Sequence, residues 1–338
     1  MTSPIFALTA RGLEAVVQAE LETFAGVQIQ SQAYRRVHGI GDPGALTSLR
    51  CADDLFIEVD HWDDVMHTRD MLAEFTDLGT RLDLEPAVMC IKQIRQLPDA
   101  ITFSVTANFV GKRNYNQNEI KSFIAAGILY SNPEWSYSED DAESALNVRV
   151  FIEHQTALIG VRLTANPLHR RSYKQTSLAG SLKATVAASM IQLTQASAGQ
   201  TLLDPFCGSG TILIEAAQQG LISIGGDISP AALHITQENT HNADANIQLA
   251  QWAGGRLPLK DHSIHAIVSN LPWGRQIQVD DSLHLLYQHA YAEMQRVIMP
   301  DGVLVLLTTL PELLPDSPAQ SFEISLYGQN PQVMIFRS

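Results

Sequence analysis

The chain has 338 residues, of which 45% are hydrophobic, and a formal net charge of −14 at pH 7. This length suits two or three domains, and the composition is that of an ordinary globular protein. The sequence shows no apolar run of the ~18 residues that a membrane span needs, no signal-peptide pattern and no paired cysteines. We therefore expect a cytoplasmic protein with no membrane partner and no metal.

The first region, residues 1–59, has the pattern of a small α+β unit. Apolar residues recur at helical spacing over 13–24, and Gly26 would end that helix. The sequence Asp42-Pro43-Gly44 is typical of a turn. Short apolar segments predict strands at 5–9, 27–31 and 34–40.

The second region, residues 60–165, has the pattern of another α+β unit. A helix is predicted over 119–130, after a loop at 111–118. Strands with alternating polarity are predicted at 100–107, 145–153 and 155–163, the last two joined by a tight turn.

From about residue 177 the pattern changes to apolar runs that alternate with helical segments. Such alternation is typical of βαβ units and a parallel sheet. The predicted strands are 201–203, 222–225, 247–249, 264–268 and 303–308. Two further runs, 322–326 and 333–336, predict an antiparallel hairpin at the edge of that sheet.

A glycine-rich turn joins the first of these strands to a helix that begins near Thr211. Gly208 and Gly210 would let the backbone pass close to a ligand, and the start of the helix offers free N–H groups. Ligands of open α/β sheets bind at the carboxyl ends of the strands. The turn lacks the full dinucleotide and phosphate-loop patterns, so it does not by itself name the ligand.

The second strand of this region ends at Asp227. A carboxylate at that place can accept hydrogen bonds from ribose hydroxyls. Asp227 also precedes Ser229-Pro230, a pattern that starts helices. Together with the glycine-rich turn, we favour ribose binding.

The segment DPFCGSGTILIEAA, followed by GGDIS, resembles the first two cofactor motifs of class I S-adenosylmethionine methyltransferases. The resemblance implies that Asp204 and the turn hold the methionine end and that Asp227 holds the ribose. The segment Gln251-Trp252-Ala253 lacks the acidic residue that often contacts adenine in such enzymes, so that contact is unassigned. The implied cofactor-binding residues are Asp204, Pro205, Phe206, Gly208, Gly210, Thr211, Asp227 and Ile228.

The fourth strand is followed by Asn270-Leu271-Pro272-Trp273-Gly274, which resembles the [DN]-x-P-aromatic motif of amino-methyltransferases. An exocyclic amine is a weak nucleophile because its lone pair is delocalised, and two acceptors on its N–H groups would orient it and stabilise its developing charge. The Asn270 side chain and the Leu271 carbonyl could be those acceptors. Pro272 would stiffen the turn, and Trp273 offers a stacking face for a base. The alternative is an ordinary strand-to-helix turn.

The net charge argues against a nucleic-acid partner, but the distribution of charge matters more. Residues 154–203 contain no acid, and residues 86–118 contain only Asp99. These two stretches are basic patches on an acidic chain. The candidate phosphate contacts are Lys112, Arg113, Lys121, Arg170, Arg171 and Lys174.

The N-terminal half carries a second resemblance. FALTARGLEAVVQAEL resembles the ferredoxin-like domain that accompanies THUMP domains, and segments within 103–163 resemble THUMP itself. PLHRRSYK resembles the linker to the methyltransferase. The chain is therefore identified as similar to THUMP-domain class I RNA methyltransferases, and most of all to tRNA guanine-N2 methyltransferases of the acceptor stem.

This resemblance implies three parts and an RNA substrate, with tRNA as the expected one. We expect a ferredoxin-like domain at 1–59, a THUMP domain at 60–165, and a linker with a Rossmann-like α/β methyltransferase domain at 166–338. Three alternatives stay open. They are a guanine-N2 methyltransferase of ribosomal RNA, a protein glutamine or DNA adenine methyltransferase, and an inactive RNA-binding module.

Overall fold

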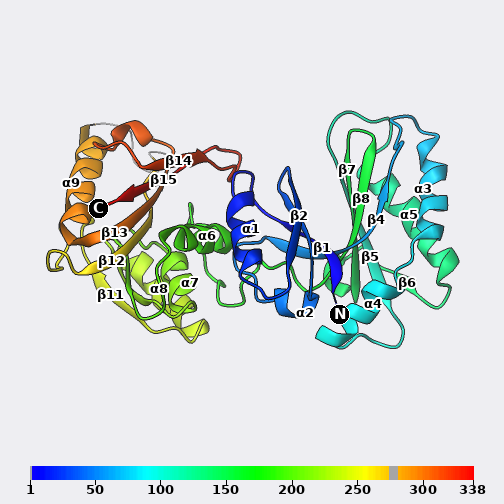
Figure 1. Ribbon diagram of the computed structural model, residues 1–338, viewed down its shortest axis with the longest axis horizontal. Helices are drawn as coiled ribbons and strands as arrows, with labels where there is room; N and C mark the ends of the chain where they lie inside the picture. The colour runs from blue at the N-terminus through cyan, green and yellow to red at the C-terminus, as the bar shows by residue number, and fades with distance from the viewer. Residues whose placement is uncertain (1, 274–280) are drawn as a thin grey trace. The chain divides into compact units, whose positions relative to one another are not determined.

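The computed structural model describes residues 2–273 and 281–338, which form two compact units, each built on its own β-sheet (Figure 1). Unit 1 contains residues 2–8, 18–49 and 54–168. Unit 2 contains 9–17, 50–53 and the rest of the described chain from His169 onward. Two short N-terminal segments therefore belong to the same unit as the C-terminal half.

Unit 1 has an eight-stranded sheet in the order β2-β3-β1-β4-β8-β7-β5-β6. All its pairs are antiparallel except β5 with β6 and with β7. The strands are β1 (Ser3–Leu8), β2 (Gln28–Ala33), β3 (Arg36–Gly41), β4 (Asp54–Trp62), β5 (Thr102–Phe109), β6 (Ser136–Tyr137), β7 (Leu146–Glu153) and β8 (Thr156–Arg162). Strand β4 runs across residue 59, so the division at that residue stays a proposal.

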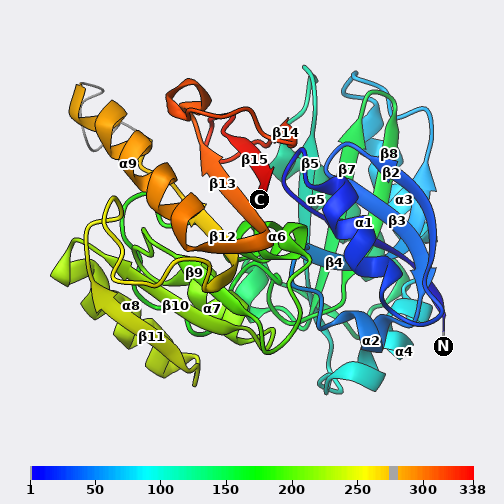
Figure 2. The same cartoon turned by 60° about the vertical axis from the view of Figure 1, so that its left-hand side comes forward.

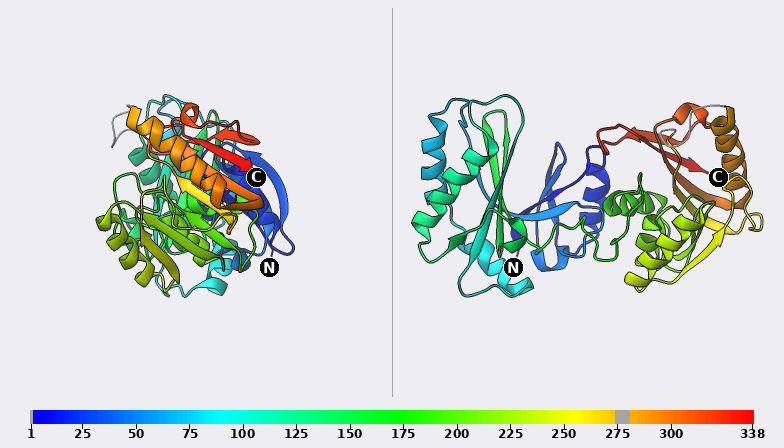
Figure 3. Two further views of the ribbon diagram at one scale, coloured as in Figure 1. Left: turned by 90° about the vertical axis from the view of Figure 1, so that its left-hand side faces the viewer. Right: turned by 180° about the vertical axis from the view of Figure 1, so that it is seen from behind.

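The helices of this half include two that sequence patterns did not predict, α3 and α4. Helices α3 and α5 pack against each other, and α5 also packs on β5 (Figure 3, right). The expected turn at Asp42 is instead the start of a short helix, whose first turn the Asp42 side chain caps through Gly44 N at 3.2 Å. The helices are α1 (Glu14–Glu22), α2 (Pro43–Leu46), α3 (Met71–Arg81), α4 (Glu85–Ile94) and α5 (Gln117–Ser131).

Unit 2 has a seven-stranded sheet in the order β11-β10-β9-β12-β13-β15-β14. The first five strands are parallel, and β14 and β15 form the expected antiparallel hairpin at the edge. The strands are β9 (Thr201–Asp204), β10 (Ile222–Asp227), β11 (Ile247–Gln251), β12 (Ile264–Asn270), β13 (Ile298–Thr308), β14 (Gln320–Glu323) and β15 (Gln332–Arg337). This confirms the prediction of a Rossmann-like α/β fold for the C-terminal half.

Helices flank the parallel strands of unit 2. Helix α7 contacts both α6 and α8, and α9 runs along β13 (Figure 2). The apolar face of α9 packs with residues of β12, β13 and β15 in one core. The helices are α6 (Ala184–Thr194), α7 (Thr211–Ala217), α8 (Pro230–Asn242) and α9 (Asp281–Val297). Within 2–273 and 281–338, none of the helices has the length and apolar content of a membrane span.

Candidate active site

The loops that follow β9, β10 and β12 meet at the carboxyl edge of the parallel sheet. Strand β9 lies between β10 and β12, so the chain winds outward in both directions from this strand. Such a reversal of strand order leaves a crevice at the carboxyl ends, where ligands of open α/β folds bind. The two motifs singled out in the sequence come together at this point.

The glycine-rich turn after β9 depends on its two glycines. Gly208 and Gly210 have φ angles of +52° and +79°, a region that side chains rarely adopt. A Cβ atom on Gly210 would lie 2.6 Å from Cγ2 of Thr236 on α8. A Cβ on Gly208 would meet nothing within 4 Å. Gly208 therefore faces open space, as a residue that lets a ligand approach the backbone must.

Asp227, at the end of β10, is hydrogen-bonded both to the glycine-rich turn and to the loop that follows it. Its carboxylate accepts hydrogen bonds from Gly208 N at 3.0 Å and from Ser229 N at 2.9 Å. A carboxylate has about four acceptor sites, so each oxygen keeps capacity for a hydroxyl donor. The neighbouring Ile228 is 69% exposed. A carboxylate beside an exposed apolar surface suits a ribose joined to a flat base.

Asp204 is placed inside the protein rather than on the surface of the turn. It is buried, and its Oδ1 accepts hydrogen bonds from Phe206 N at 3.1 Å and Ser269 Oγ at 2.7 Å. Burial raises the pKa of Asp204 to about 7, against the lowering effect of those two hydrogen bonds. Asp204 thus holds the turn and β12 together, a role that the sequence did not indicate.

The end of β11, where the sequence lacks an acidic residue, contacts the neighbouring loops through Gln251 and Trp252. Trp252 is buried and donates its indole N–H to the Pro205 carbonyl at 3.1 Å. Gln251 donates its side-chain amide to the Ile228 carbonyl at 3.1 Å, and Ala253 is exposed. Trp252 and Gln251 therefore stabilise the loops that follow β9 and β10, and neither carries a carboxylate.

Asn270, the last residue of β12, has its side-chain amide oriented by the segment that precedes α6. Its Nδ2 donates to the Gly180 carbonyl at 3.4 Å. Its Oδ1 is buried and has no hydrogen-bond partner in the described part of the chain. A buried acceptor without a donor costs about 1–3 kcal/mol, so this oxygen is poised to receive one.

The rest of the motif is held by its backbone. Leu271 N donates to the Leu307 carbonyl at 3.0 Å, which continues the pairing of β12 with β13. The Trp273 indole N–H is buried and also lacks a partner among the residues described. Gly274, the last residue of the motif, lies outside the described residues.

Residues 174–183, between the PLHRRSYK segment and α6, run along this edge of the sheet. The sequence analysis did not predict their contacts with the site. Ser181 Oγ lies 2.7 Å from Ser209 Oγ in the glycine-rich turn, and the Ser181 carbonyl accepts from the Tyr327 hydroxyl at 3.0 Å. On α8, Asn239 donates to both the Thr176 and Ser209 carbonyls at 3.0 Å. These contacts join residues far apart in sequence, so no local pattern could reveal them.

The candidate phosphate contacts fall into two groups. Lys112 and Arg170 are exposed, and Lys121 is half-buried. The others, Arg113, Arg171 and Lys174, use their charged groups in contacts within the protein. Arg113 donates to Tyr115 Oη at 2.9 Å, and Lys174 donates to the Leu182 carbonyl.

Arg171 is the clearest correction, because it is part of a buried ion-pair network around Glu215. Glu215 of α7 is fully buried, and it accepts from Arg171 Nε at 3.0 Å, Arg50 NH2 at 2.6 Å and the Tyr173 hydroxyl at 2.8 Å. A buried carboxylate needs such partners because an unpaired charge inside a protein is costly. Arg171 therefore stabilises unit 2 and is withdrawn as a phosphate contact.

Among residues 2–273 and 281–338, no group of three His, Cys, Asp or Glu side chains gathers as metal ligands. This edge of the sheet offers acceptors, backbone N–H groups and exposed apolar surface. The parallel sheet and its flanking helices are a Rossmann-like α/β domain, the fold of class I methyltransferases. Residues 171–324 match the family described as the RMKL-like methyltransferase domain.

Curated relatives with stated functions match parts of the chain. A Thermus thermophilus protein named tRNA (guanine(6)-N2)-methyltransferase is 29% identical over 223 residues, 65% of each chain. A bovine protein named U6 snRNA (guanine-N(2))-methyltransferase THUMPD2 is 28% identical over 213 residues, 61% of this chain. The chain spans about two fifths of the length of that bovine relative.

Solved structures match the fold over nearly the whole length. TrmN from Thermus thermophilus has a TM-score of 0.80 and 24% identity, over 99% of both chains. SMU.472, described as a putative methyltransferase complexed with SAH, has a TM-score of 0.78 and 19% identity, over 99% of this chain and 98% of that one. These matches confirm the fold class.

Proposed function

We propose that the protein transfers a methyl group from S-adenosylmethionine to the exocyclic N2 amine of a guanine in RNA, with the tRNA acceptor stem as the expected substrate. The observation that carries this proposal is the buried, unpartnered Oδ1 of Asn270. It lies at the end of β12, directly beside β9 and its glycine-rich turn. An acceptor at this position suits an amine N–H that must be aligned with a methyl donor.

The residues of the turn and of β10 would hold the cofactor. The open space at Gly208, the spare acceptor capacity of Asp227 and the exposed Ile228 fit a ligand with a ribose, an adenine and a charged end. The proposed cofactor-binding residues are Pro205, Phe206, Gly208, Gly210, Thr211, Asp227 and Ile228, and Asp204 holds the turn in place from inside the protein. S-adenosylmethionine supplies an electrophilic methyl group on its sulfonium sulfur.

The catalytic residues act on the amine. Asn270 Oδ1 and the Leu271 carbonyl accept its two N–H groups, so that the nitrogen lone pair points at the methyl carbon. S-adenosylmethionine, when bound, would supply the methyl group to this nitrogen and leave as S-adenosylhomocysteine, and the nitrogen would lose one proton to water. Pro272 limits the motion of the turn, and Trp273 stacks on the base.

The RNA partner rests on the relatives and on the exposed cations. Two relatives are named as guanine-N2 methyltransferases of tRNA and of U6 snRNA. A ferredoxin-like domain at 1–59 and a THUMP domain at 60–165 would bind the RNA, with Lys112, Lys121 and Arg170 as phosphate contacts. A cytoplasmic location is part of this proposal.

The experiment is methyl transfer from labelled S-adenosylmethionine to unmodified tRNA transcripts, followed by nucleoside analysis. We expect N2-methylguanosine. Ribosomal RNA, DNA and a glutamine-containing protein extract serve as alternative acceptors in parallel reactions. Product only with one of these would move the substrate and refute the tRNA assignment. Cofactor binding without transfer to any acceptor would instead indicate an inactive RNA-binding module.

A further inference from the structure

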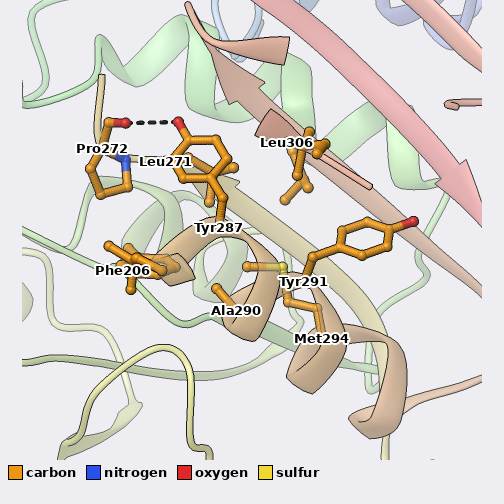
Figure 4. A pocket seen from close by; sticks show the side chains of 10 residues that line it. Phe206, Leu271, Pro272, Tyr287, Ala290, Tyr291, Met294 and Leu306 are labelled. Carbon is orange, nitrogen blue, oxygen red and sulfur yellow. Dashed lines mark hydrogen bonds between the residues drawn. The ribbon is translucent and has the colours of Figure 1, made fainter. Parts of the chain in front are cut away.

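A tyrosine behind the catalytic turn fixes the direction of one backbone carbonyl. Tyr287 of α9 is 2% exposed and lines an apolar pocket with Phe206, Leu271 and Pro272 (Figure 4). Its hydroxyl lies 2.7 Å from the Pro272 carbonyl oxygen and 2.7 Å from Thr308 Oγ1. The phenol therefore bridges the turn after β12 to the end of β13.

The hydrogen bonds in this bridge have only one consistent direction. A carbonyl can only accept, so the Tyr287 hydroxyl proton goes to Pro272. Thr308 Oγ1 accepts from Leu310 N at 2.9 Å and directs its own proton to Tyr287. Burial raises the pKa of Tyr287 to about 12, so the phenol remains a donor at all physiological pH values.

The bridge adds a second fixed point to the turn, on the far side of the Leu271–Pro272 peptide from the pairing with β13. The Leu271 N–H is bound to Leu307, and the ring of Pro272 fixes its φ angle near −65°. The ψ angle of Pro272 is set by the direction of its carbonyl, which Tyr287 holds. The Leu271 carbonyl lies between these two fixed points, which together restrict the directions it can take.

We propose that Tyr287 is a positioning residue that aims the Leu271 carbonyl at the amine to be methylated. This inference rests on the proposed function, in which the Leu271 carbonyl is the second acceptor. Without the hydroxyl, the Pro272 carbonyl loses its buried partner, and the turn is free to rotate toward another donor. The ring of Tyr287 lines the pocket, and it would remain there if only the hydroxyl were removed.

Tyr291 provides a matched control on the same helix. It lies four residues further along α9, lines the same pocket and is 4% exposed. Its hydroxyl points away from Pro272 and accepts from Gln295 Nε2 at 2.8 Å (Figure 4). The substitutions Tyr287→Phe and Tyr291→Phe each remove one hydroxyl from similar surroundings, and only the first touches the turn.

The test compares steady-state kinetics of the full-length wild type, Tyr287→Phe and Tyr291→Phe on the acceptor that the wild type methylates best. We expect Tyr287→Phe to lower kcat about ten- to hundredfold, because a small misplacement of reacting groups has effects of that size. KM for S-adenosylmethionine should stay within about twofold, since the cofactor loops are unchanged. Tyr291→Phe should keep wild-type kcat. Equal kcat values for the two variants would overturn the inference.

A second measurement separates this inference from the proposed function. Crystal structures of the wild type and of Tyr287→Phe should show the Pro272 carbonyl turned to a new direction in the variant. An unchanged carbonyl would overturn the inference even if kcat fell. If the wild type methylates an acceptor other than guanine N2, the proposed function fails. The kinetic and crystallographic comparisons then still decide the role of Tyr287.

Discussion

Ser269 donates its hydroxyl to Asp204 Oδ1 at 2.7 Å, and both residues are buried. Ser269 directly precedes Asn270, and Asp204 ends the strand before the glycine-rich turn. This hydrogen bond therefore joins the strand that carries the proposed catalytic acceptor to the strand that carries the cofactor turn. A shift of either strand would change the distance between the two halves of the site.

The environment of Asp204 predicts a pH-dependent stability. Its pKa is about 7 in the folded protein and 3.8 as the ordinary value, so the folded state binds the proton more tightly. The stabilisation by this group is complete below the lower value and is lost as the pH rises through the higher one. We expect the Asp204→Asn variant, which cannot ionise, to gain roughly 2–4 kcal/mol relative to wild type across that interval.

The measurement is urea unfolding of both proteins at a series of pH values. The difference in free energy of unfolding between variant and wild type should grow as the pH rises. A difference that stays constant with pH would contradict a raised pKa at Asp204. The variant Ser269→Ala removes one donor to the carboxylate and so raises the pKa of Asp204 further, and the loss of stability should extend to higher pH.

Asn270 supplies the acceptor that the proposed reaction needs. We expect Asn270→Ala to abolish methyl transfer, because no other side chain of the motif offers an acceptor at this place. RNA binding should be nearly unchanged, since only one polar group at the end of β12 is lost. Asn270→Asp keeps an acceptor oxygen and should retain more activity than Asn270→Ala.

Rates and RNA affinities of these variants, measured side by side, test the role of Asn270. Substantial turnover by Asn270→Ala would show that the side-chain carbonyl is not the acceptor. Equal losses in RNA binding and in turnover would instead point to a general disturbance of the edge of the sheet.

Asp227 is expected to determine cofactor affinity. In Asp227→Asn, one carboxylate oxygen becomes an amide that cannot accept the N–H of Gly208 or Ser229. The same change removes the negative charge that would accept hydrogen bonds from the ribose. Loss of a hydrogen bond to a charged group should weaken binding of S-adenosylmethionine by roughly 10- to 100-fold. Calorimetric titration with S-adenosylmethionine measures this change. Glu238→Gln, on the exposed face of α8, is the control and should bind like wild type.

Gly210 is required by both its φ angle and its surroundings. Gly210→Ala should destabilise the protein by about 1–2 kcal/mol for the positive φ angle and by about 1–3 kcal/mol more for crowding against Thr236. Gly199 has a φ of +85° with no neighbour within 4 Å of an added Cβ, so Gly199→Ala shows the first effect alone. Equal losses of unfolding free energy in the two variants would rule out the crowding.

The neighbours Arg170 and Arg171 should behave differently. Arg170→Ala should weaken RNA binding and reduce the salt-dependence slope by about 1, as loss of one phosphate contact does. Arg171→Ala should instead lower the free energy of unfolding by about 1–3 kcal/mol, because Glu215 loses a buried donor. Filter binding at several salt concentrations and urea unfolding distinguish the two. An unchanged slope for Arg170→Ala would remove it from the RNA interface.

The elements that depend on local patterns could be predicted from the sequence. The strands of the parallel sheet, the edge hairpin and the turn at Gly208 each have a signal within a few residues. Helix α4 was not predicted; it carries Pro86 in its first turn, where proline is tolerated.

The parts that depend on distant partners could not be predicted. Arg171 looks like a free cation until Glu215, 44 residues away, is placed beside it. Tyr287 and Thr308 have no motif, and their role follows only from the position of Pro272 between them. Sequence spacing does not encode such contacts, because they arise when strands and helices pack.

Unit 2 includes residues 9–17 and 50–53 from the beginning of the chain. Arg50 brings one of the cations that neutralise Glu215, and Asp53 accepts from Lys183 at 2.8 Å and from Thr185 at 2.6 Å. The C-terminal half is therefore not a transferable module by itself. A chimera that keeps only residues 166–338 would leave Glu215, Lys183 and Thr185 without these contacts, so recombination within this architecture must carry residues 50–53 along with the C-terminal half.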